Sequence, residues 1–574
     1  MMQSQHIVDM DTTSTHTISN QFDELQDYNL FETDTILKEI LHHYHSELQA
    51  EHAAFGETVG RASFFQAADL ANRHTPELNR FDARGRRIDQ VEFHPAWHQV
   101  MQTNRQFNVH AYPFITQPFI HSDDDHKNSA WVDWATKFYL TGQVEAGNLC
   151  PHAMTLGCIP LLQREPKLWA EIGEKLLSSE YDARDIPIAE KKSIWIGMGM
   201  TEKQGGSDVR ANQTFAKPIE KAGRGEAYLL TGHKWFFSVP MSDAHLVVAQ
   251  TEHEGIGCFF VPRRLSDGSL NQVHVQRLKE KVGNRSNSSS EVEFQNAWGI
   301  MIGEEGRGIP TIIEMANYTR LTCSVGSTAI LRQALVQCLA YTRQRQTFGK
   351  ALAEQPLMQA VLADLALETE AALQLSMHLA SHYDQIAKQD NANENALSQA
   401  WIRLMTPAAK FWICKRAVEL TGEAMEAFGG NGYVDNGIMA RLFREAPVNT
   451  IWEGSGNIMC LDVLRAMQRE SELIEILLAS FSEECASHQT LKIERSQLYE
   501  MLMLPPDQLQ FQARTLVTRL VLLAQSVLML RYSESDVAEA FVQSRYSAMH
   551  GRVVGMLNIS QADVQRLFDR ALAS

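Results

Sequence analysis

A β-rich segment between two long helical stretches most constrains how this chain can fold. From about 196 to 300, runs such as AYLLTGHKWFFSV, HLVVAQ and GCFFVP alternate with Gly, Pro, Asn and Asp turns, which is typical of strands. Apolar residues recur at helical spacing before this segment and again after about 305. We therefore predict an α+β protein, mostly helical, with one β domain enclosed by helices.

These changes of pattern divide the chain into five segments. Residues 1–35 are polar and predict an N-terminal arm that is mobile or loosely docked. We then expect an N-terminal helical domain over 36–195, a central β domain over 196–304, a helical bundle over 305–468 and a C-terminal helical module over 469–574. At roughly 100 to 200 residues per domain, the length of 574 residues suits this division.

Composition narrows the class of protein. The N-terminus lacks the basic start and apolar core of a signal peptide, so we expect a cytoplasmic protein without membrane contact. The eight cysteines form no C-x-x-C pair, and His42, His43 and His45 lack companion ligands, so we expect neither disulfides nor a metal site. The formal charge of −17 means that any nucleic-acid contact must rest on a local basic patch.

The run MGMTEKQGGSD, Met198 to Asp208, indicates a loop that holds a phosphate-bearing cofactor. Thr201 and Ser207 offer small hydroxyls, and Gly205 and Gly206 let the backbone approach a ligand without a Cβ in the way. The alternative is an ordinary polar turn between strands, because short glycine loops are weak signals.

Several motifs in one order resemble those of the acyl-CoA dehydrogenase flavoprotein family: TEKQGGSD, YTRQRQTFGK, EAFGGNGY and IWEGSGN. The chain is more closely similar to the AidB-like branch, the bacterial adaptive-response alkylation proteins, through GHKWFFSVPMSDAHLV, GNRSNSSSEVEF, TPAAKFWICKR and PVNTIWEGSGNIMCLDVLR. The resemblance covers nearly the whole chain. It implies the acyl-CoA dehydrogenase fold and a homotetramer with one FAD per subunit between the β domain and the helical bundle.

The resemblance also implies which residues contact the flavin. Thr201 should bond to the pyrimidine edge, Ser207 should reach the pyrophosphate, and Phe236, Phe237 and Ser238 should line the ring near N5. Aromatic side chains beside a hydroxyl suit a ring that is apolar on its faces and polar at its edge, although these aromatics could instead be core residues. The further cofactor contacts implied are Met198, Met200, Gly206, Ile451, Trp452, Ser455 and Asn457.

A second set of residues is implied to hold the dinucleotide of a neighbouring subunit. Arg345 and Phe348 belong to it, and the planar fork of an arginine can pair two phosphate oxygens. A surface arginine that caps a helix would look the same in sequence. Glu426, Gly429 and Gly430 would supply the adenosine contact, and Glu426 stands where many family members carry glutamine.

Glu453 matches the general base that takes the α-proton of an acyl-CoA thioester. Because this proton is weakly acidic, the base needs burial to raise its pKa. Gly454 would let the substrate pass close to the backbone, and Arg320 matches the arginine on the thioester side. The alternative for Glu453 is a carboxylate stabilised by the dipole of the helix that follows.

Two classes of function follow from the sequence. The first is an FAD-dependent oxidoreductase that introduces an α,β double bond into a short or branched acyl-CoA; the retained base does not require it to be fast. The second is a protective flavoprotein that binds double-stranded DNA in the alkylation response, with little or no dehydrogenase activity. Arg465 and Arg469 are its candidate DNA contacts, although residues 471–574 hold nine Lys and Arg against twelve Asp and Glu.

Overall fold

The computed structural model describes residues 15–116, 129–252, 255–388, 392–547 and 561–572. Its N-terminal region is mainly helical: α1 (Thr35–His43), α2 (Gln49–Gly60), α3 (Ala62–Arg73), α4 (Pro95–Gln106), α5 (Tyr112–Thr116), α6 (Ala130–Gly142), α7 (Leu149–Gln163) and α8 (Pro166–Leu177). Helix α1 begins at a buried cap, because the Oδ1 of Asp34 accepts a hydrogen bond of 3.1 Å from the amide of Leu37.

An antiparallel hairpin interrupts these helices, which the helical pattern of residues 36–195 did not predict. It consists of β1 (Glu77–Phe81) and β2 (Arg87–Glu92). The hairpin joins the central β domain, since Asp89 accepts a hydrogen bond of 3.1 Å from the amide of Val275.

The described part of the predicted N-terminal arm is docked rather than loose. Asn20 exchanges two hydrogen bonds of 2.8 Å with the backbone of Gln346, and the backbone of Leu25 is held by the side chain of Gln337. Leu30 and Phe31 are buried in the core. The low apolar content that predicted a loose arm is offset by these amide contacts. Residues 1–14 lie outside the described residues.

The central β domain is a sheet that closes on itself. Its strands are β3 (Ile196–Gly199), β4 (Phe215–Pro218), β5 (Ala227–Ser238), β6 (Ala244–Thr251), β7 (Gly255–Pro262), β8 (Val273–Leu278) and β9 (Ser289–Ile302). The strand order is β3-β6-β4-β5-β9-β7, with β8 on β9, and β7 also pairs with β6. Short turns of 3-10 helix at Ile188–Glu190 and Val209–Ala211 flank β3.

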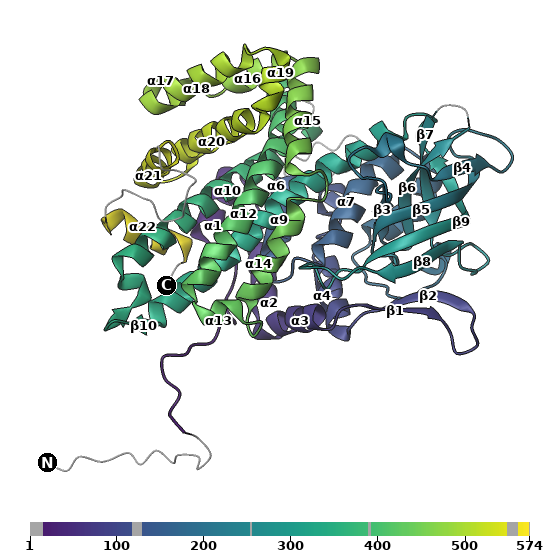
Figure 1. Cartoon of the computed structure of the whole chain (residues 1–574), viewed down its shortest axis with the longest axis horizontal. Helices are drawn as coiled ribbons and strands as arrows, with labels where there is room; N and C mark the ends of the chain where they lie inside the picture. The colour runs from purple at the N-terminus through teal and green to yellow at the C-terminus, as the bar shows by residue number, and fades with distance from the viewer. Residues whose placement is uncertain (1–14, 117–128, 253–254, 389–391, 548–560, 573–574) are drawn as a thin grey trace.

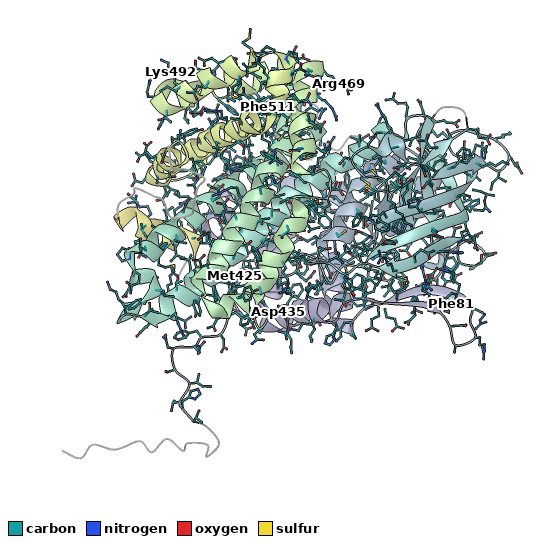
Figure 2. All side chains as sticks on the ribbon, in the orientation of Figure 1. Phe81, Met425, Asp435, Arg469, Lys492 and Phe511 are labelled. Atoms are coloured by element: carbon teal, nitrogen blue, oxygen red, sulfur yellow. The ribbon has the colours of Figure 1, made fainter. Side chains whose placement is uncertain are left out.

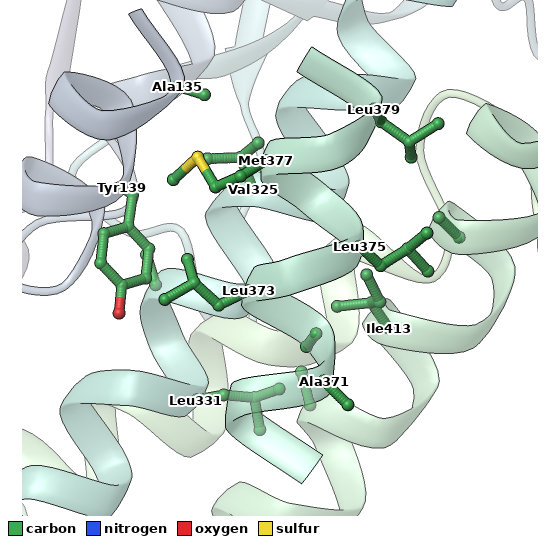
Figure 3. Packing of buried hydrophobic residues seen from close by; sticks show 14 of the residues in the cluster. Ala135, Tyr139, Val325, Leu331, Ala371, Leu373, Leu375, Met377, Leu379 and Ile413 are labelled. Carbon is green, nitrogen blue, oxygen red and sulfur yellow. The ribbon is translucent and has the colours of Figure 1, made fainter. Parts of the chain in front are cut away.

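A bundle of long helices follows the β domain. Its elements are α9 (Gly308–Gln344), β10 (Gln346–Thr347), β11 (Lys350–Ala351), a 3-10 turn at Leu352–Glu354, α10 (Pro356–Lys388), α11 (Ala392–Ala400), a π-helical turn at Trp401–Met405, α12 (Thr406–Ala427), α13 (Gly430–Tyr433), α14 (Ile438–Asn449) and α15 (Gly456–Arg469). Figure 3 shows its apolar core, in which Leu373, Leu375 and Met377 of α10 lie among side chains of α6, α9 and α12. In Figure 1 the β domain lies at one end of this bundle.

The C-terminal helices stack on the side of the bundle in Figure 1: α16 (Glu472–Ala479), α17 (Ser482–Ser487), α18 (Gln489–Leu502), α19 (Pro506–Phe511), α20 (Ala513–Tyr532), α21 (Ser535–Arg545) and α22 (Gln561–Ala571). Arg570 of α22 pairs with Glu39 of α1 at 2.8 Å and with Glu370 of α10 at 2.9 Å. Among the described residues, α20 is long and apolar enough to cross a bilayer, but 72% of its apolar 18-residue window is buried, as in a core helix.

Candidate active site

A pocket with about 520 Å³ of empty space lies between α6, α7, α9 and the C-terminal half of α14. Glu453 lies on its wall. The other lining residues are mostly apolar or small: Phe138, Ala146, Leu149, Cys150, Ala153, Met154, Asn284, Thr319, Thr322, Cys323, Gly326, Glu445, Val448, Asn449 and Trp452. An apolar pocket with a few polar groups is the usual form of a small-molecule site.

The Glu453 carboxyl group is the candidate base of this pocket. Its Oε2 accepts a hydrogen bond of 2.6 Å from the hydroxyl of Thr319. Burial raises the pKa of Glu453, while the Thr319 hydrogen bond and the charges of Arg320 and Lys410 act in the opposite direction. Its backbone is left-handed, with φ of 58°, which is unusual for a residue other than glycine and is common at functional sites.

Two cations hold the backbone of this turn. Arg320 donates from Nε to the Glu453 carbonyl at 3.3 Å and pairs with Asp462 at 2.7 Å, and Lys410 donates to the carbonyl of Gly454. The predicted substrate role of Arg320 therefore needs correction, because its guanidinium is buried and already engaged by Asp462. Arg320 positions Glu453 instead. Gly454 lies in the same turn, partly exposed.

Strand β5 presents one aromatic ring outward and buries the next. Phe236 is 51% exposed, whereas Phe237 is 2% exposed and stacks on His245 with ring centroids 3.8 Å apart. The prediction that the Phe237 side chain lines the flavin is therefore wrong. A register shift between Lys234 and Phe237 changes the alternation of the strand and turns Phe237 into the sheet core.

The remaining residues of the predicted cofactor loop lie beside β5. The Thr201 carbonyl accepts a hydrogen bond of 2.8 Å from the amide of Trp235, so Thr201 lies next to the strand that carries Ser238. Ser238 in turn reaches the pocket through Cys150, whose thiol has its pKa raised to about 12 by burial despite hydrogen bonding to Ser238. Ser207 is exposed on the outer part of the loop.

These surfaces fit a flavin ring. Half-exposed Phe236 on β5 and exposed Ile451 after α14 offer apolar faces, and Thr201 and Ser238 offer hydroxyls beside them. A Cβ at Gly206 would lie 2.6 Å from the Oγ1 of Thr201, so only glycine lets the loop fold so closely around that hydroxyl. Apolar faces with polar groups at the edge match the chemistry of an isoalloxazine.

The other predicted flavin contacts do not all lie on this surface. Met198 of β3 and Met200 just after it pack with Trp452 against the same apolar cluster, which joins the β domain to the turn of Glu453. Ser455 is exposed. Asn457 is exposed too, but its Oδ1 accepts a hydrogen bond of 2.8 Å from Arg514 of α20, so this oxygen faces the C-terminal helices and not the predicted cofactor.

The second predicted set lies at the other end of the bundle. Arg345 follows α9 and donates to the backbone of Asn20, and Phe348 is 98% exposed in the adjoining hairpin. Arg320 and Arg345 are 25 residues apart on one helix, or about 37 Å at 1.5 Å per residue. One protomer therefore does not bring the two sets together.

Glu426, Gly429 and Gly430 are all exposed and lie on the Arg345 side of the bundle. The rings of Tyr341 and Phe428 stack there with centroids 4.2 Å apart and join the two segments. The second set is thus a local cluster on the protein surface.

Sequence reasoning missed a buried ion pair beneath the cofactor loop. Lys234 Nζ lies 2.7 Å from Glu202 Oε1, and neither side chain is exposed. Burial raises the pKa of Glu202, but Lys234 and the amide of Gln213 outweigh this and lower it to about 2. Burial lowers the pKa of Lys234 to about 8. The pair ties the loop to β5, and no sequence signal connects residues 32 positions apart.

A basic groove borders the loop after β8. Arg73, Lys279, Lys281 and Arg285 line it, together with backbone and polar groups of residues 287–289. The ammonium of Lys279 lies 3.6 Å from the Trp235 ring centroid. This chemistry suits a phosphate-bearing ligand.

The two predicted DNA contacts are exposed, whereas two arginines of the C-terminal helices form ion pairs. Arg465 and Arg469 are exposed one turn apart on α15, and Arg469 lies at its outer end (Figure 2). In contrast, Arg519 pairs with Glu494, and Arg531 pairs with Glu484 at 2.5 Å. Ion pairs with neighbouring acids thus engage both of these arginines.

Three family models match the chain in the order of its structural regions. Residues 20–183 match the adaptive response protein AidB N-terminal domain, residues 197–297 the acyl-CoA dehydrogenase middle domain, and residues 306–468 the acyl-CoA dehydrogenase C-terminal domain.

The chain is 43% identical over 531 residues to AidB of Escherichia coli (strain K12), covering 92% of this chain and 94% of that protein. It is similar in fold to Caenorhabditis elegans ACDH-11 in complex with C11-CoA, with TM-score 0.79, 24% identity and coverage of 98% and 95%. An acyl-CoA dehydrogenase from Bacillus anthracis complexed with FAD aligns with TM-score 0.63, 17% identity and coverage of 83% and 81%. The predicted fold class is thereby confirmed.

Proposed function

The chain belongs to the AidB branch of the acyl-CoA dehydrogenase family, which uses FAD, and on this basis we propose that it oxidises a short or branched acyl-CoA to its α,β-unsaturated thioester. The observation that carries the proposal is the Glu453 carboxyl group, which lines an apolar pocket and has a raised pKa.

Glu453 would remove the α-proton of the thioester. A carboxylate with a raised pKa is a stronger base than an ordinary one, and the Thr319 hydroxyl holds the accepting group at 2.6 Å. Arg320 and Lys410 fix the backbone of the turn, so that the carboxyl group keeps one position while its protonation changes.

Bound FAD would supply the two-electron acceptor for the β-hydrogen. Phe236, Ile451, Thr201 and Ser238 are the residues that would hold its ring. The apolar walls of the pocket would bind the acyl chain and exclude water from Glu453. The basic groove of Arg73, Lys279, Lys281 and Arg285 supports binding of a ligand that carries phosphates.

The experiment that tests this proposal is anaerobic addition of isovaleryl-CoA to FAD-replete protein, with the flavin absorbance followed over time. We expect bleaching in the wild type and its loss in Glu453→Gln, by roughly 10²-fold or more. Glutamine keeps the size of the side chain and can still accept from Thr319. Retained flavin absorbance in the variant would show that its cofactor site is intact.

Two outcomes would contradict the proposal. Bleaching at an undiminished rate in Glu453→Gln would mean that another group is the base. A flavin that stays oxidised with isovaleryl-CoA and with straight-chain acyl-CoA substrates would leave Glu453 as a structural carboxylate.

We also propose a homotetramer in which the Arg345 end of one subunit completes the cofactor site of another. The separation of the two residue sets along α9 supports this, as does the exposure of Phe348, Leu357 and Tyr433 at that end. Light scattering of the purified protein tests it: a monomeric mass at micromolar concentration would contradict it, and Arg345→Ala should lower FAD affinity without changing the pocket of Glu453.

As a second function we propose that the protein binds double-stranded DNA in the response to alkylation. Exposed Arg465 and Arg469 support it, because no ion pair holds them among the described residues. Because the whole chain is acidic, binding must rest on this local pair of arginines. Their contacts should be mainly to phosphates, so affinity should fall steeply with salt.

A labelled duplex and fluorescence anisotropy test the DNA proposal. Arg469→Glu should weaken binding several-fold, whereas Lys492→Glu, which makes the same charge change on exposed α18, should not. Glu453→Gln should leave DNA affinity intact. Equal effects of the Arg469 and Lys492 changes would indicate nonspecific attraction, and no binding at low salt would exclude the function.

A further inference from the structure

The pocket that holds Glu453 contains a second carboxyl group, which the proposed reaction does not use. Glu445 of α14 lies eight residues before Glu453 in the sequence and lines the same pocket. Asn284, from the loop after β8, lines it too. Glu445 is 4% exposed and Asn284 2% exposed. Most of the other wall residues are apolar, and the remaining polar ones are Thr319, Thr322, Asn449 and Glu453. We refer to Glu445 and Asn284 together as the polar end of the pocket.

Each of the two side chains has an oxygen atom without a hydrogen-bond partner. Glu445 Oε1 accepts a bond of 2.7 Å from the amide of Asn284, but within the described part of the chain neither Glu445 Oε2 nor Asn284 Oδ1 has a partner. Buried polar atoms are nearly always paired in folded proteins. Two such oxygen atoms beside one cavity therefore call for a hydrogen-bonding group that occupies the cavity.

The neighbouring cations do not supply this group. Lys281 donates to the carbonyl of Asn287 at 2.6 Å. Arg441 lies one turn before Glu445 on α14, does not line the pocket and lies close enough to Glu24 to affect its pKa. Neither forms an ion pair with Glu445 within 4.0 Å.

The polar end is rigid because the loop after β8 is pressed onto α14. A Cβ at Gly283 would lie 1.9 Å from the carbonyl oxygen of Arg444, so the loop fits only with glycine there. Ser286 adds a hydrogen bond of 2.7 Å to Glu145. The two oxygen atoms are thus held in fixed positions, as a specificity site requires.

We propose that the acyl group of the substrate carries a hydroxyl, which accepts a hydrogen bond from the carboxyl group of Glu445 and donates one to the Oδ1 of Asn284. The inference rests on the proposed function for the thioester end. A neutral group is favoured over an ammonium group, because burial and the charge of Glu145 raise the pKa of Glu445 and favour its neutral form. A purely aliphatic acyl chain would leave both oxygen atoms unpaired.

A site built to bind a hydroxyl discriminates strongly against the same ligand without it, because its own polar groups are then left buried and unpaired. A purely apolar pocket gains nothing from the hydroxyl. The two cases therefore differ in whether a terminal hydroxyl tightens binding.

The test measures binding rather than turnover. Thioether analogues of acyl-CoA, which lack the acidic α-proton, are titrated into FAD-replete protein by calorimetry. The chains run from four to eight carbons, each with and without a terminal hydroxyl. We expect one length at which the hydroxyl tightens binding by about 10-fold or more.

Two variants test whether the preference for the hydroxyl depends on Glu445 and Asn284. Glu445→Leu should abolish the preference for the hydroxyl and tighten binding of the matching alkyl chain. Asn284→Gly, which suits the positive φ of 55° at this position, should reduce the preference and serves if the leucine variant does not fold. Thr322→Val is the matched control on the same pocket wall and should leave the preference unchanged.

The proposal is overturned if the hydroxyl tightens binding at no chain length, or if Glu445→Leu and Asn284→Gly both keep the preference. Failure of the proposed function looks different, because it is a flavin that no acyl-CoA reduces. A protein that oxidises alkyl thioesters but ignores the hydroxyl would retain the proposed function and lose this inference.

Discussion

The ammonium group of Lys410 donates a hydrogen bond to the carbonyl of Gly454, the residue directly after Glu453. A buried cation thus lies behind the turn that presents the base. Its charge lowers the pKa of Glu453 and opposes the effect of burial. Lys410 therefore both fixes the turn and limits how far the pKa of the base can rise.

Lys410→Met should slow flavin reduction by about 10-fold at neutral pH and move the rate profile to higher pH. The carboxyl group loses a nearby positive charge, so its pKa rises further and less of it is ionised. Lys415→Met removes the same charge from the same helix without the bond to Gly454 and should have little effect. Stopped-flow reduction between pH 5 and 9 makes the comparison; identical profiles would show that Lys410 is merely structural.

Thr319→Val should also raise the pKa of Glu453. The hydroxyl bonds to the charged carboxylate at 2.6 Å, and hydrogen bonds to charged groups contribute about 1.5–3 kcal/mol, which corresponds to a shift of about one to two units. Thr319→Ser keeps the hydroxyl and should behave as the wild type. The pH midpoint of flavin reduction is the measurement, and an unchanged midpoint in the valine variant would rule out this role.

Lys234→Met should destabilise the protein by about 3–5 kcal/mol, because it leaves the Glu202 carboxylate buried without its cation. In the double variant with Glu202→Gln no charge is left buried, and the amide oxygen keeps the hydrogen bond from one of the two backbone amides of Gln213 and Thr214, so part of the loss should be recovered. Urea unfolding of the three proteins measures this. Additive losses would mean that the two residues do not interact.

Glu445 should make the protein less stable as pH rises. Burial raises its pKa from 4.5 to about 7, so the folded state holds a proton that the unfolded state releases between these values. The free energy of unfolding should therefore fall through this window, by about 3 kcal/mol in total from this group. Glu445→Gln should remove that part of the slope, whereas Glu472→Gln on the surface should not. Urea unfolding at pH 5 and pH 8 compares them, and parallel slopes would contradict the assignment.

The order of helices and strands follows from the sequence because the core elements have strong periodicity. The hairpin β1–β2 was missed because its strands are short and mostly polar, with β1 exposed along nearly its whole length. The docking of residues 20–34 was missed for a related reason, since it depends on the side chains of Gln333 and Gln337 far along the chain.

Site residues within a local sequence motif were predictable. Those whose position depends on tertiary contacts were not. Glu453 and the loop from Thr201 follow from local motifs. The inward turn of Phe237 depends on a bulge in β5, and the engagement of Arg320 depends on Asp462, 142 residues away. The polar end of the pocket joins Asn284 to Glu445 across 161 residues, and no spacing rule connects them.

The contacts of α22 with α1 and α10 affect how the chain can be synthesised and cut. Thr35 donates to the carbonyl of Arg570, and the Arg570 guanidinium reaches Glu39 and Glu370. Helix α1 therefore completes its contacts only after α22 has been synthesised. A truncation that ends before α22 would leave Glu370 buried without its cation, so point substitutions are better suited than shortened chains for assigning a role to the C-terminal helices.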